Sequence, residues 1–144
     1  MSRTARIQTK LATFTAELYE ESAPQAVNNF CDLARGGFYD GLIIFKVIPH
    51  VLFQTGCPQN DGTGRASHTI PCELDGEKQY HDQGVLSMAH CGRDTASSQF
   101  FVCMNRRKTE HFDGNHTCFG KIVTNIELID NLVYGDVIQR ISIS

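Results

Sequence analysis

Hydrophobic and polar residues alternate at every second position in two neighbouring stretches near the start of the chain. Residues 7–11 and 14–18 both show this alternation, which is the period of a β-strand with one buried face. Because only a short connection separates them, we expect the two strands to pair as a hairpin.

The period changes to that of a helix in the next segment, "EESAPQAVNNFCDLARGG". Within residues 26–34, apolar side chains follow one another at spacings of three and four, so one face of the helix is apolar. Ser22 is expected to cap this helix, with Gln25 completing a capping box and Pro24 tolerated in the first turn. The glycines at 36–37 are expected to end it.

Most of the remaining chain is rich in β-branched and aromatic residues, which favour strands. The expected strands cover residues 42–48, 51–53, 84–89, 99–104, 118–123 and 137–143. A short amphipathic helix is expected over residues 125–132. Seven or eight short antiparallel strands with two helices suit a mainly β fold, in which the helices plug the ends of a closed barrel.

Composition narrows the class of protein. A chain of 144 residues with 41% hydrophobic and 20% charged residues is typical of one globular domain, here residues 1–144. The net charge of −3 argues against nucleic-acid binding, and the basic run at 105–108 is more typical of a solvated loop. No segment is long and apolar enough to span a bilayer or to act as a secretory signal. We therefore expect a cytoplasmic monomer that contacts no membrane.

The six cysteines are scattered singly, without any C-x-x-C pair. In a reducing compartment they are best interpreted as small buried hydrophobic residues. Zinc is the alternative, because His68 is close to Cys72 and His116 is close to Cys118. Structural zinc sites usually show paired short spacings, so we expect no metal and no cofactor.

A long, weakly patterned segment covers residues 54–83 and is dense in Gly, Asn, Asp and Ser. A loop of this length in a compact domain is usually functional. Gly62 and Gly64 suggest phosphate binding only weakly, because no strand-to-helix transition frames them. The segments "SMAHCG", "SSQFFV" and "EHFDGNHTCFG" mix apolar and hydrogen-bonding groups, which is typical of an apolar ligand pocket with a few polar contacts.

Six motifs, taken in chain order, resemble the signatures of the cyclophilins, which are peptidyl-prolyl cis/trans isomerases. These are "FYDGLIIFKVIP", "FQTGCP", "GTGR", "GVLSMAHCG", "SSQFF" and "HFDGNHTCFG". The resemblance covers essentially the whole chain, and the chain is similar to short bacterial, cytoplasmic members. It implies an eight-stranded antiparallel barrel capped by two helices, with the active site on the outer surface of the barrel. The implied substrates are proline-containing peptides and unfolded proteins.

The resemblance also implies which residues bind the substrate. The family's proline pocket falls on Val51, Leu52, Phe101, Phe112 and His116. The backbone strip that binds an extended peptide falls on Ala89, His90 and Cys91, with Gln99 beside it. His90 replaces the family's common Asn, but this position acts mainly through backbone groups.

The catalytic position carries an unusual residue. The family usually reads Phe-His-Arg-Val-Ile-Pro, and residues 44–49 read Ile-Phe-Lys-Val-Ile-Pro, so Lys46 stands where the family has its catalytic arginine. A charge in the middle of an apolar run is explained if the strand presents it outward over the proline pocket. Gln54 matches the family and is expected to act with Lys46.

Lysine keeps the positive charge but lacks the planar fork of donors that arginine provides. We therefore expect a peptidyl-prolyl isomerase of reduced activity. The alternative is a proline-peptide binding module or chaperone-like protein in which catalysis is largely lost. A metal- or redox-regulated thiol protein is a third interpretation, and it rests only on the cysteines.

Many cyclophilins carry a tryptophan that binds the inhibitor cyclosporin at the position of His111, and this chain has no tryptophan. Histidine keeps a possible hydrogen-bond donor but loses most of the apolar area of an indole. We therefore expect weak cyclosporin binding.

Overall fold

Eight antiparallel strands form one sheet in the computed structural model, which describes residues 2–144. The strands are β1 (Thr4–Gln8), β2 (Thr13–Leu18), β3 (Lys46–Ile48), β4 (Leu52–Thr55), β5 (Val85–Met88), β6 (Phe100–Cys103), β7 (Cys118–Ile122) and β8 (Arg140–Ile143). The helices are α1 (Pro24–Arg35), α2 (Arg106–Thr109) and the 3-10 helices η1 (Glu110–Phe112) and η2 (Ile126–Asn131). The mainly β class is thus confirmed, and a hairpin forms as expected, but its first strand covers Thr4–Gln8 rather than residues 7–11.

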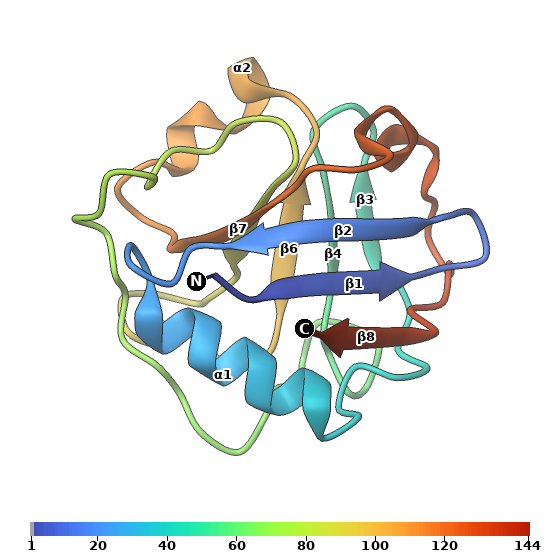
Figure 1. Ribbon diagram of the computed structural model, residues 1–144, viewed down its shortest axis with the longest axis horizontal. Coiled ribbons are helices and arrows are strands. Elements are labelled where there is room, and N and C mark those ends of the chain that lie inside the picture. The colour runs from blue at the N-terminus through green and yellow to red at the C-terminus, as the bar shows by residue number, and fades with distance from the viewer. Residues whose placement is uncertain (1) are drawn as a thin grey trace.

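The sheet has the order β3-β4-β6-β5-β7-β2-β1-β8 and curls back on itself. Figure 1 shows β1 and β2 running across in front of β4 and β6, with α1 along one end of the curled sheet. The two ends of the chain meet: Thr4 and Ser144 exchange backbone hydrogen bonds of 2.8 and 2.9 Å.

The expected closed barrel is wrong, because β3 and β8 end the sheet and do not pair with each other. Residues 42–45 were expected to be part of this strand, but they lie outside β3. Ile43 forms an isolated bridge with Val137, and the Ile138 N–H donates to the Leu42 carbonyl at 2.7 Å. These contacts precede β3 and β8, and no ladder joins the two strands themselves, so the barrel stays open there.

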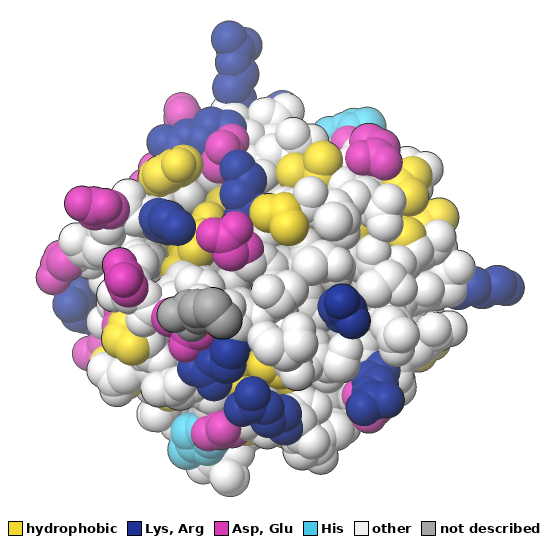
Figure 2. All heavy atoms as spheres, in the orientation of Figure 1, with side chains coloured by type: hydrophobic (Ala, Val, Ile, Leu, Met, Phe, Trp, Pro, Cys, Tyr) yellow, Lys and Arg dark blue, Asp and Glu magenta, His cyan; other side chains and the backbone are white. Residues whose placement is uncertain are grey.

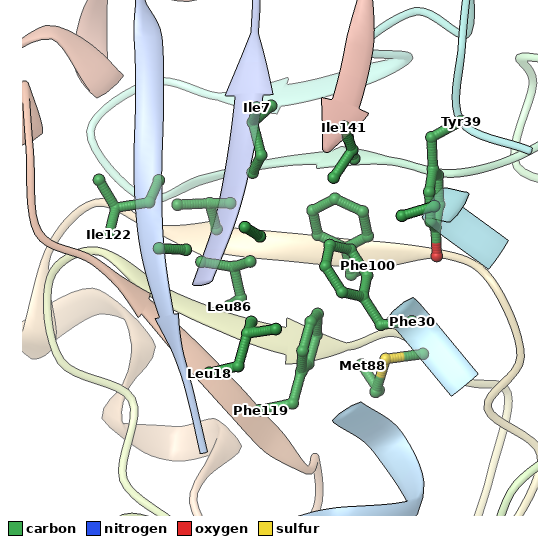
Figure 3. Close-up of a cluster of buried hydrophobic side chains, with 14 of the residues drawn as sticks. Ile7, Leu18, Phe30, Tyr39, Leu86, Met88, Phe100, Phe119, Ile122 and Ile141 are labelled. Carbon is green, nitrogen blue, oxygen red and sulfur yellow. The ribbon is translucent and has the colours of Figure 1, made fainter. Parts of the chain in front are cut away.

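Both faces of the central strands are covered, so every residue of β5 and β6 is buried. On the inner face, aromatic rings pack against α1 (Figure 3). The Phe30 ring lies 5.5 Å from the Phe100 ring in an edge-on arrangement and 5.0 Å from the Phe119 ring. Among the hydrophobic residues of this inner core, Tyr39 carries a hydroxyl group, which donates to the Ser98 carbonyl at 2.9 Å.

The predicted capping box of α1 is wrong. Ala23 is the N-cap residue, and its side chain accepts no hydrogen bond. The carboxylate of Glu73 takes this role, accepting from the backbone N–H groups of Gln25 at 3.1 Å and Ala26 at 2.9 Å. A negative charge is favourable at the positive end of a helix. The residue that caps α1 therefore comes from the long loop rather than from Ser22.

The end of α1 agrees with the prediction, since the helix stops at Arg35 and Gly37 has a positive φ of 76°. The second predicted helix forms only in part. Residues 125–132 contain the 3-10 helix η2 instead of an α-helix, after Asn125 in a left-handed conformation. The basic run at 105–108 belongs to the short helix α2, which Asn105 caps by accepting from Arg107 N–H at 3.0 Å.

All six cysteines are free, and four of them are buried as expected: Cys31, Cys57, Cys103 and Cys118. The prediction is wrong for Cys91, which is exposed, and Cys72 is only half-buried. Within residues 2–144, no three His, Cys, Asp or Glu side chains are grouped so that they could hold a metal ion.

One face of the molecule mixes side chains of both charge signs with small, separate hydrophobic groups (Figure 2). Of the helices in residues 2–144, none has the length and apolar character that crossing a membrane requires.

Candidate active site

A row of four side chains crosses four adjacent strands on the outer face of the sheet. In the register, Lys46 of β3 is opposite Gln54 of β4, Gln54 is opposite Phe101 of β6, and Phe101 is opposite Ser87 of β5. Directly opposed residues project from the same face of a sheet, with Cβ atoms about 4.5–5.5 Å apart. Residues distant in sequence thus come to lie side by side.

A second hydrophobic cluster, which we term the outer cluster, surrounds this row. Its buried members are Tyr19, Leu52, Val85, Phe101, Cys103 and Cys118, with Val51, Ala89 and Phe112 packed against them. Residues 105–117, including α2 and η1, contribute Phe112 to this cluster. The outer cluster is therefore separate from the inner core and lies on the opposite face of the same strands.

The structure brings together all five residues expected to form a proline pocket. Val51, Leu52, Phe101 and Phe112 belong to the outer cluster. The His116 ring lies 5.4 Å from the Phe101 ring and 5.2 Å from the Phe112 ring, edge-on to both. Phe101 is only 3% exposed, so it forms the floor, whereas Val51, Phe112 and His116 are half-buried and form the accessible walls.

A chain of side-chain amides orients Gln54. The Gln99 amide donates to the Gly62 and Gly64 carbonyls at 3.1 and 2.6 Å, which turns its oxygen toward Gln54. The Gln54 amide nitrogen then donates to this oxygen at 2.9 Å. Since amide orientation follows from the hydrogen-bond network, Gln54 Oε1 faces away as an acceptor. Within residues 2–144 it has no hydrogen-bond partner. The Gly62 and Gly64 carbonyls therefore orient the Gln99 side chain, which in turn orients Gln54.

Lys46 is exposed, as its predicted role requires. Its ammonium group forms neither an ion pair nor a hydrogen bond with any residue in the range 2–144, so it is available to a ligand.

The predicted peptide-binding strip lines a cavity of about 410 Å³ beside the outer cluster. Ala89, His90 and Cys91 form one wall of this cavity, and Gln54 and Gln99 form another. The Ala89 N–H donates to the Gln99 carbonyl at 3.0 Å, which ties the strip to the start of β6. The cavity and the pocket are adjacent, because Ala89 contributes to both.

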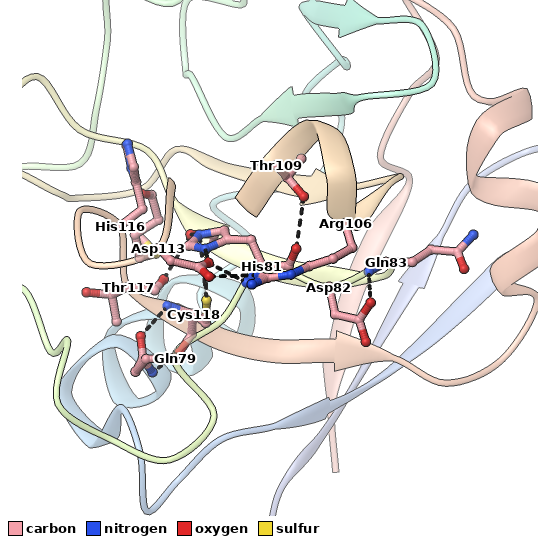
Figure 4. A network of polar contacts seen from close by, with 12 residues as sticks. Gln79, His81, Asp82, Gln83, Arg106, Thr109, Asp113, His116, Thr117 and Cys118 are labelled. Atoms are coloured by element: carbon pink, nitrogen blue, oxygen red, sulfur yellow. Dashed lines mark hydrogen bonds and ion pairs between the residues drawn. The ribbon is translucent and has the colours of Figure 1, made fainter. Parts of the chain in front are cut away.

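His81 is a buried site residue that sequence reasoning missed. Its Nδ1 lies 2.8 Å from Asp113 Oδ1, and its Nε2 lies 2.7 Å from Ser87 Oγ. Its ring also stacks on Phe101, with centroids 5.8 Å apart and planes 11° from parallel. Figure 4 shows the surrounding network, in which Arg106 approaches Asp113 at 2.7 Å. His81 thus supports the floor of the pocket from beneath.

The order Asp113–His81–Ser87 is that of a hydrolase triad, but the arrangement cannot act as one. Ser87 and His81 are both fully buried, and the Phe101 ring covers the imidazole. No substrate carbonyl can reach Ser87 Oγ, so the network has a structural role. No local signal marks it, because Asp113 lies 32 residues after His81 and only the fold brings the two together.

Burial keeps the imidazoles of His81 and His116 neutral. Burial lowers the pKa of His81, and the opposing attraction of the Asp113 carboxylate is weaker. For Asp113, burial raises the pKa, but hydrogen bonds from His81 and Arg106 outweigh it, so the pKa is lowered. Burial also lowers the pKa of His116 to about 4, with further lowering by neighbouring histidines, while its hydrogen bond to the Met88 carbonyl opposes the shift. The pocket is therefore uncharged at neutral pH.

His111 is exposed on η1, and its ring lies 4.0 Å from the Phe112 ring. It stands at the rim of the pocket, where its side chain can contact a large ligand.

Comparisons with known proteins agree with this geometry. The family model described as "Cyclophilin type peptidyl-prolyl cis-trans isomerase/CLD" matches residues 4–142. Peptidyl-prolyl cis-trans isomerase B of Bacillus subtilis is 46% identical over 127 residues, covering 88% of this chain and 87% of the relative. A peptidyl-prolyl cis-trans isomerase of Helicobacter pylori is 44% identical over 142 residues, covering 97% and 86%.

Solved structures show the same fold. A cyclophilin-type isomerase of Cryptosporidium parvum is similar with a TM-score of 0.91 and 27% identity, covering 100% of this chain and 98% of that one. A crystal structure of the same parasite protein, obtained in the presence of the dipeptide Ala-Pro, gives a TM-score of 0.89 with 98% of both chains covered.

Proposed function

The chain belongs to the cyclophilin-type peptidyl-prolyl cis-trans isomerases, and we propose that Lys46 and Gln54 act on an Xaa-Pro bond whose proline the outer cluster holds. One observation carries this assignment of roles: the register aligns Lys46, Gln54 and Phe101 on one face of three adjacent strands. The proposed substrates are proline-containing peptides and unfolded proteins. The presence of Ala-Pro with the Cryptosporidium relative supports this class.

The reaction needs neither a nucleophile nor a proton transfer. Amide resonance sets a rotation barrier of about 18–20 kcal/mol. A catalyst must favour the twisted amide, in which the proline nitrogen becomes pyramidal and can accept a hydrogen bond. Such a site needs a pocket that holds the proline ring and a donor placed over its rim.

The residues of the outer face match these two needs. Phe101, Phe112 and His116 provide apolar, uncharged walls for a proline ring. Lys46 is a free cationic donor in the same row, and the oriented Gln54 offers Oε1 to a substrate N–H. The isomerised bond would lie between the row and the pocket.

We propose that the activity is lower than an arginine at this position would give. An ammonium group is a flexible point charge and cannot hold its donors in the plane of a guanidinium fork. If one charge-assisted hydrogen bond of about 1.5–3 kcal/mol is lost, the rate falls roughly ten- to a hundredfold.

A protease-free isomerisation assay on a short proline peptide tests these roles. Lys46→Arg should raise kcat/KM and Lys46→Ala should lower it, each by about tenfold or more. Lys10→Ala, an exposed lysine in the turn between β1 and β2, is the matched control. If both Lys46 variants behave like the wild type, Lys46 is not the catalytic group.

The lysine at position 46, where the family has arginine, also supports a second candidate function: a proline-peptide binding module or chaperone-like protein. The residues assigned to the pocket and the strip gather on one face, and the donor expected over them is a lysine rather than an arginine. Peptide binding by calorimetry without measurable isomerisation would favour this function. The cytoplasmic location and the monomeric state expected from the sequence stay predictions.

A further inference from the structure

Two imidazole rings stack at the junction between the peptide-binding strip and the proline pocket. The centroids of the His90 and His116 rings are 4.1 Å apart, and their planes are 12° from parallel. His90 follows β5, whereas His116 precedes β7, so the contact joins residues that lie 26 positions apart in the chain. His90 is half-buried and also lines the adjacent cavity.

Backbone partners on two sides fix the orientation of the His90 ring. Its Nε2 lies 2.6 Å from the Asn115 carbonyl, so this nitrogen carries the proton and donates. Its Nδ1 accepts from the Gly92 N–H at 3.1 Å. A neutral imidazole has one donor and one acceptor, and both are used here.

The ring of His116 is held differently. Its Nδ1 donates to the Met88 carbonyl at 2.9 Å, and the Met88 N–H donates to the Thr117 carbonyl at 2.9 Å. One ring nitrogen therefore anchors His116, and its ring could still tilt about this bond. The parallel ring of His90 covers one face of His116, while Phe101 and Phe112 meet it edge-on.

We propose that the His90 side chain is a positioning residue, which acts through His116 to hold the wall of the proline pocket in place. This inference rests on the isomerase function proposed above and extends it, because the expected role of His90 was confined to its backbone. An asparagine cannot reproduce the contact, since it has no ring to stack. A ring pair of this kind changes an equilibrium by roughly two- to tenfold.

The consequence should appear in substrate binding rather than in the chemical step. His90 does not belong to the row of Lys46 and Gln54, so the donor over the amide is unchanged when its ring is removed. A loosened His116 wall weakens the hold on the proline ring in the ground state and the transition state alike. An equal loss of binding free energy in the two states raises KM and leaves kcat nearly constant.

The test measures kcat and KM in the protease-free assay for four variants. His90→Ala and His90→Asn remove the ring, and we expect KM to rise about three- to tenfold with kcat changed less than twofold. His90→Phe restores a stacking ring and should return KM to within about twofold of the wild type. His68→Ala, an exposed histidine whose Nε2 contacts Asn29, is the control.

Two further measurements show whether His90 acts through His116. In a double-mutant cycle, His90→Ala should add almost nothing to the effect of His116→Ala. In ¹⁵N spectra of the imidazoles, the Nδ1–H signal of His116 should broaden in His90→Ala and His90→Asn but not in His90→Phe. The spectra also report whether each variant is folded.

Unchanged KM in His90→Ala and His90→Asn, or additive effects in the cycle, would overturn the inference. A wild-type protein that binds peptide without isomerising it would contradict the proposed function alone. Peptide affinity would then replace KM in the same comparison, and the expected ratios are the same.

Discussion

The two faces of β6 have different surroundings, although the adjacent residues Phe100 and Phe101 form them. Phe100 points to the inner core, where its ring meets those of Phe30, Tyr39 and Phe119. Phe101 points to the outer cluster, where it meets imidazole rings and the half-buried Phe112. Both phenylalanines are nearly fully buried.

This difference shows that burial alone does not separate core from site. The inner core consists mainly of hydrophobic side chains of the sheet and of α1, which packs over them and closes it. The outer cluster is closed by a segment that brings titratable groups, His111 and Asp113 among them, and it leaves Val51 and Phe112 half-buried. A buried aromatic floor beneath such accessible walls is what a binding pocket requires.

The strongest test of the comparison substitutes the two phenylalanines in parallel. Phe100→Ala and Phe101→Ala should each cost about 3–5 kcal/mol in the free energy of unfolding, since both side chains are buried. Phe100→Leu and Phe101→Leu keep most of the volume and should stay folded. Among these folded variants, only Phe101→Leu should weaken peptide binding, by about tenfold or more in calorimetric titration.

Equal loss of affinity in both leucine variants would mean that the outer cluster has no special role in binding. Unfolding by urea, followed by circular dichroism, gives the stability of all four variants.

Lowering the pH should destabilise the folded protein through the two buried histidines of the outer face, His116 and His81. Burial lowers the pKa of His116 to about 4 and also lowers that of His81. Between about pH 6.5 and pH 4, the unfolded chain therefore binds protons that the folded chain does not, and stability falls as the pH falls. We expect a loss of about 1–2 kcal/mol between pH 7 and pH 5 from His116.

Urea unfolding at the two pH values measures this loss, and His116→Asn should reduce it. If the variant retains the full pH dependence, the source of the dependence lies outside the His116 ring.

The smallest expected effect concerns the rim of the pocket. His111→Trp adds an indole beside Phe112 and should tighten cyclosporin binding by about tenfold, because the indole offers more apolar area and a firm donor. Leu11→Trp is the control. It adds an indole in the turn between β1 and β2, distant from Phe112. Calorimetric titration is the measurement, and tight binding by the unmodified protein would show that His111 does not limit the interaction.

Much of the fold could be predicted from local pattern. Alternation located β2 and the hairpin, although β1 begins three residues earlier than expected; helical spacing located α1, and the glycines at its end were interpreted correctly. The residues assigned to the pocket through the family resemblance do gather in one cluster, although their roles stay proposals. Strand edges were displaced by up to four residues, and the open seam between β3 and β8 was not expected.

The stretch "QFFVCM" shows why the rest could not be predicted. All of its hydrophobic residues are buried, so its pattern does not say which phenylalanine faces the inner core. Only the pairing of β6 with β4 and β5, and the segment that covers the outer face, decide that Phe101 belongs to the pocket.

The sequence by itself determined most of the element types, because side-chain period follows directly from backbone geometry over a few residues. The tertiary structure alone decided which distant groups meet. Glu73 caps α1 from about 50 residues away, His81 reaches Asp113 across 32 residues, and His90 stacks on His116. Such contacts depend on how the sheet curls and where its loops return, and no local period records either.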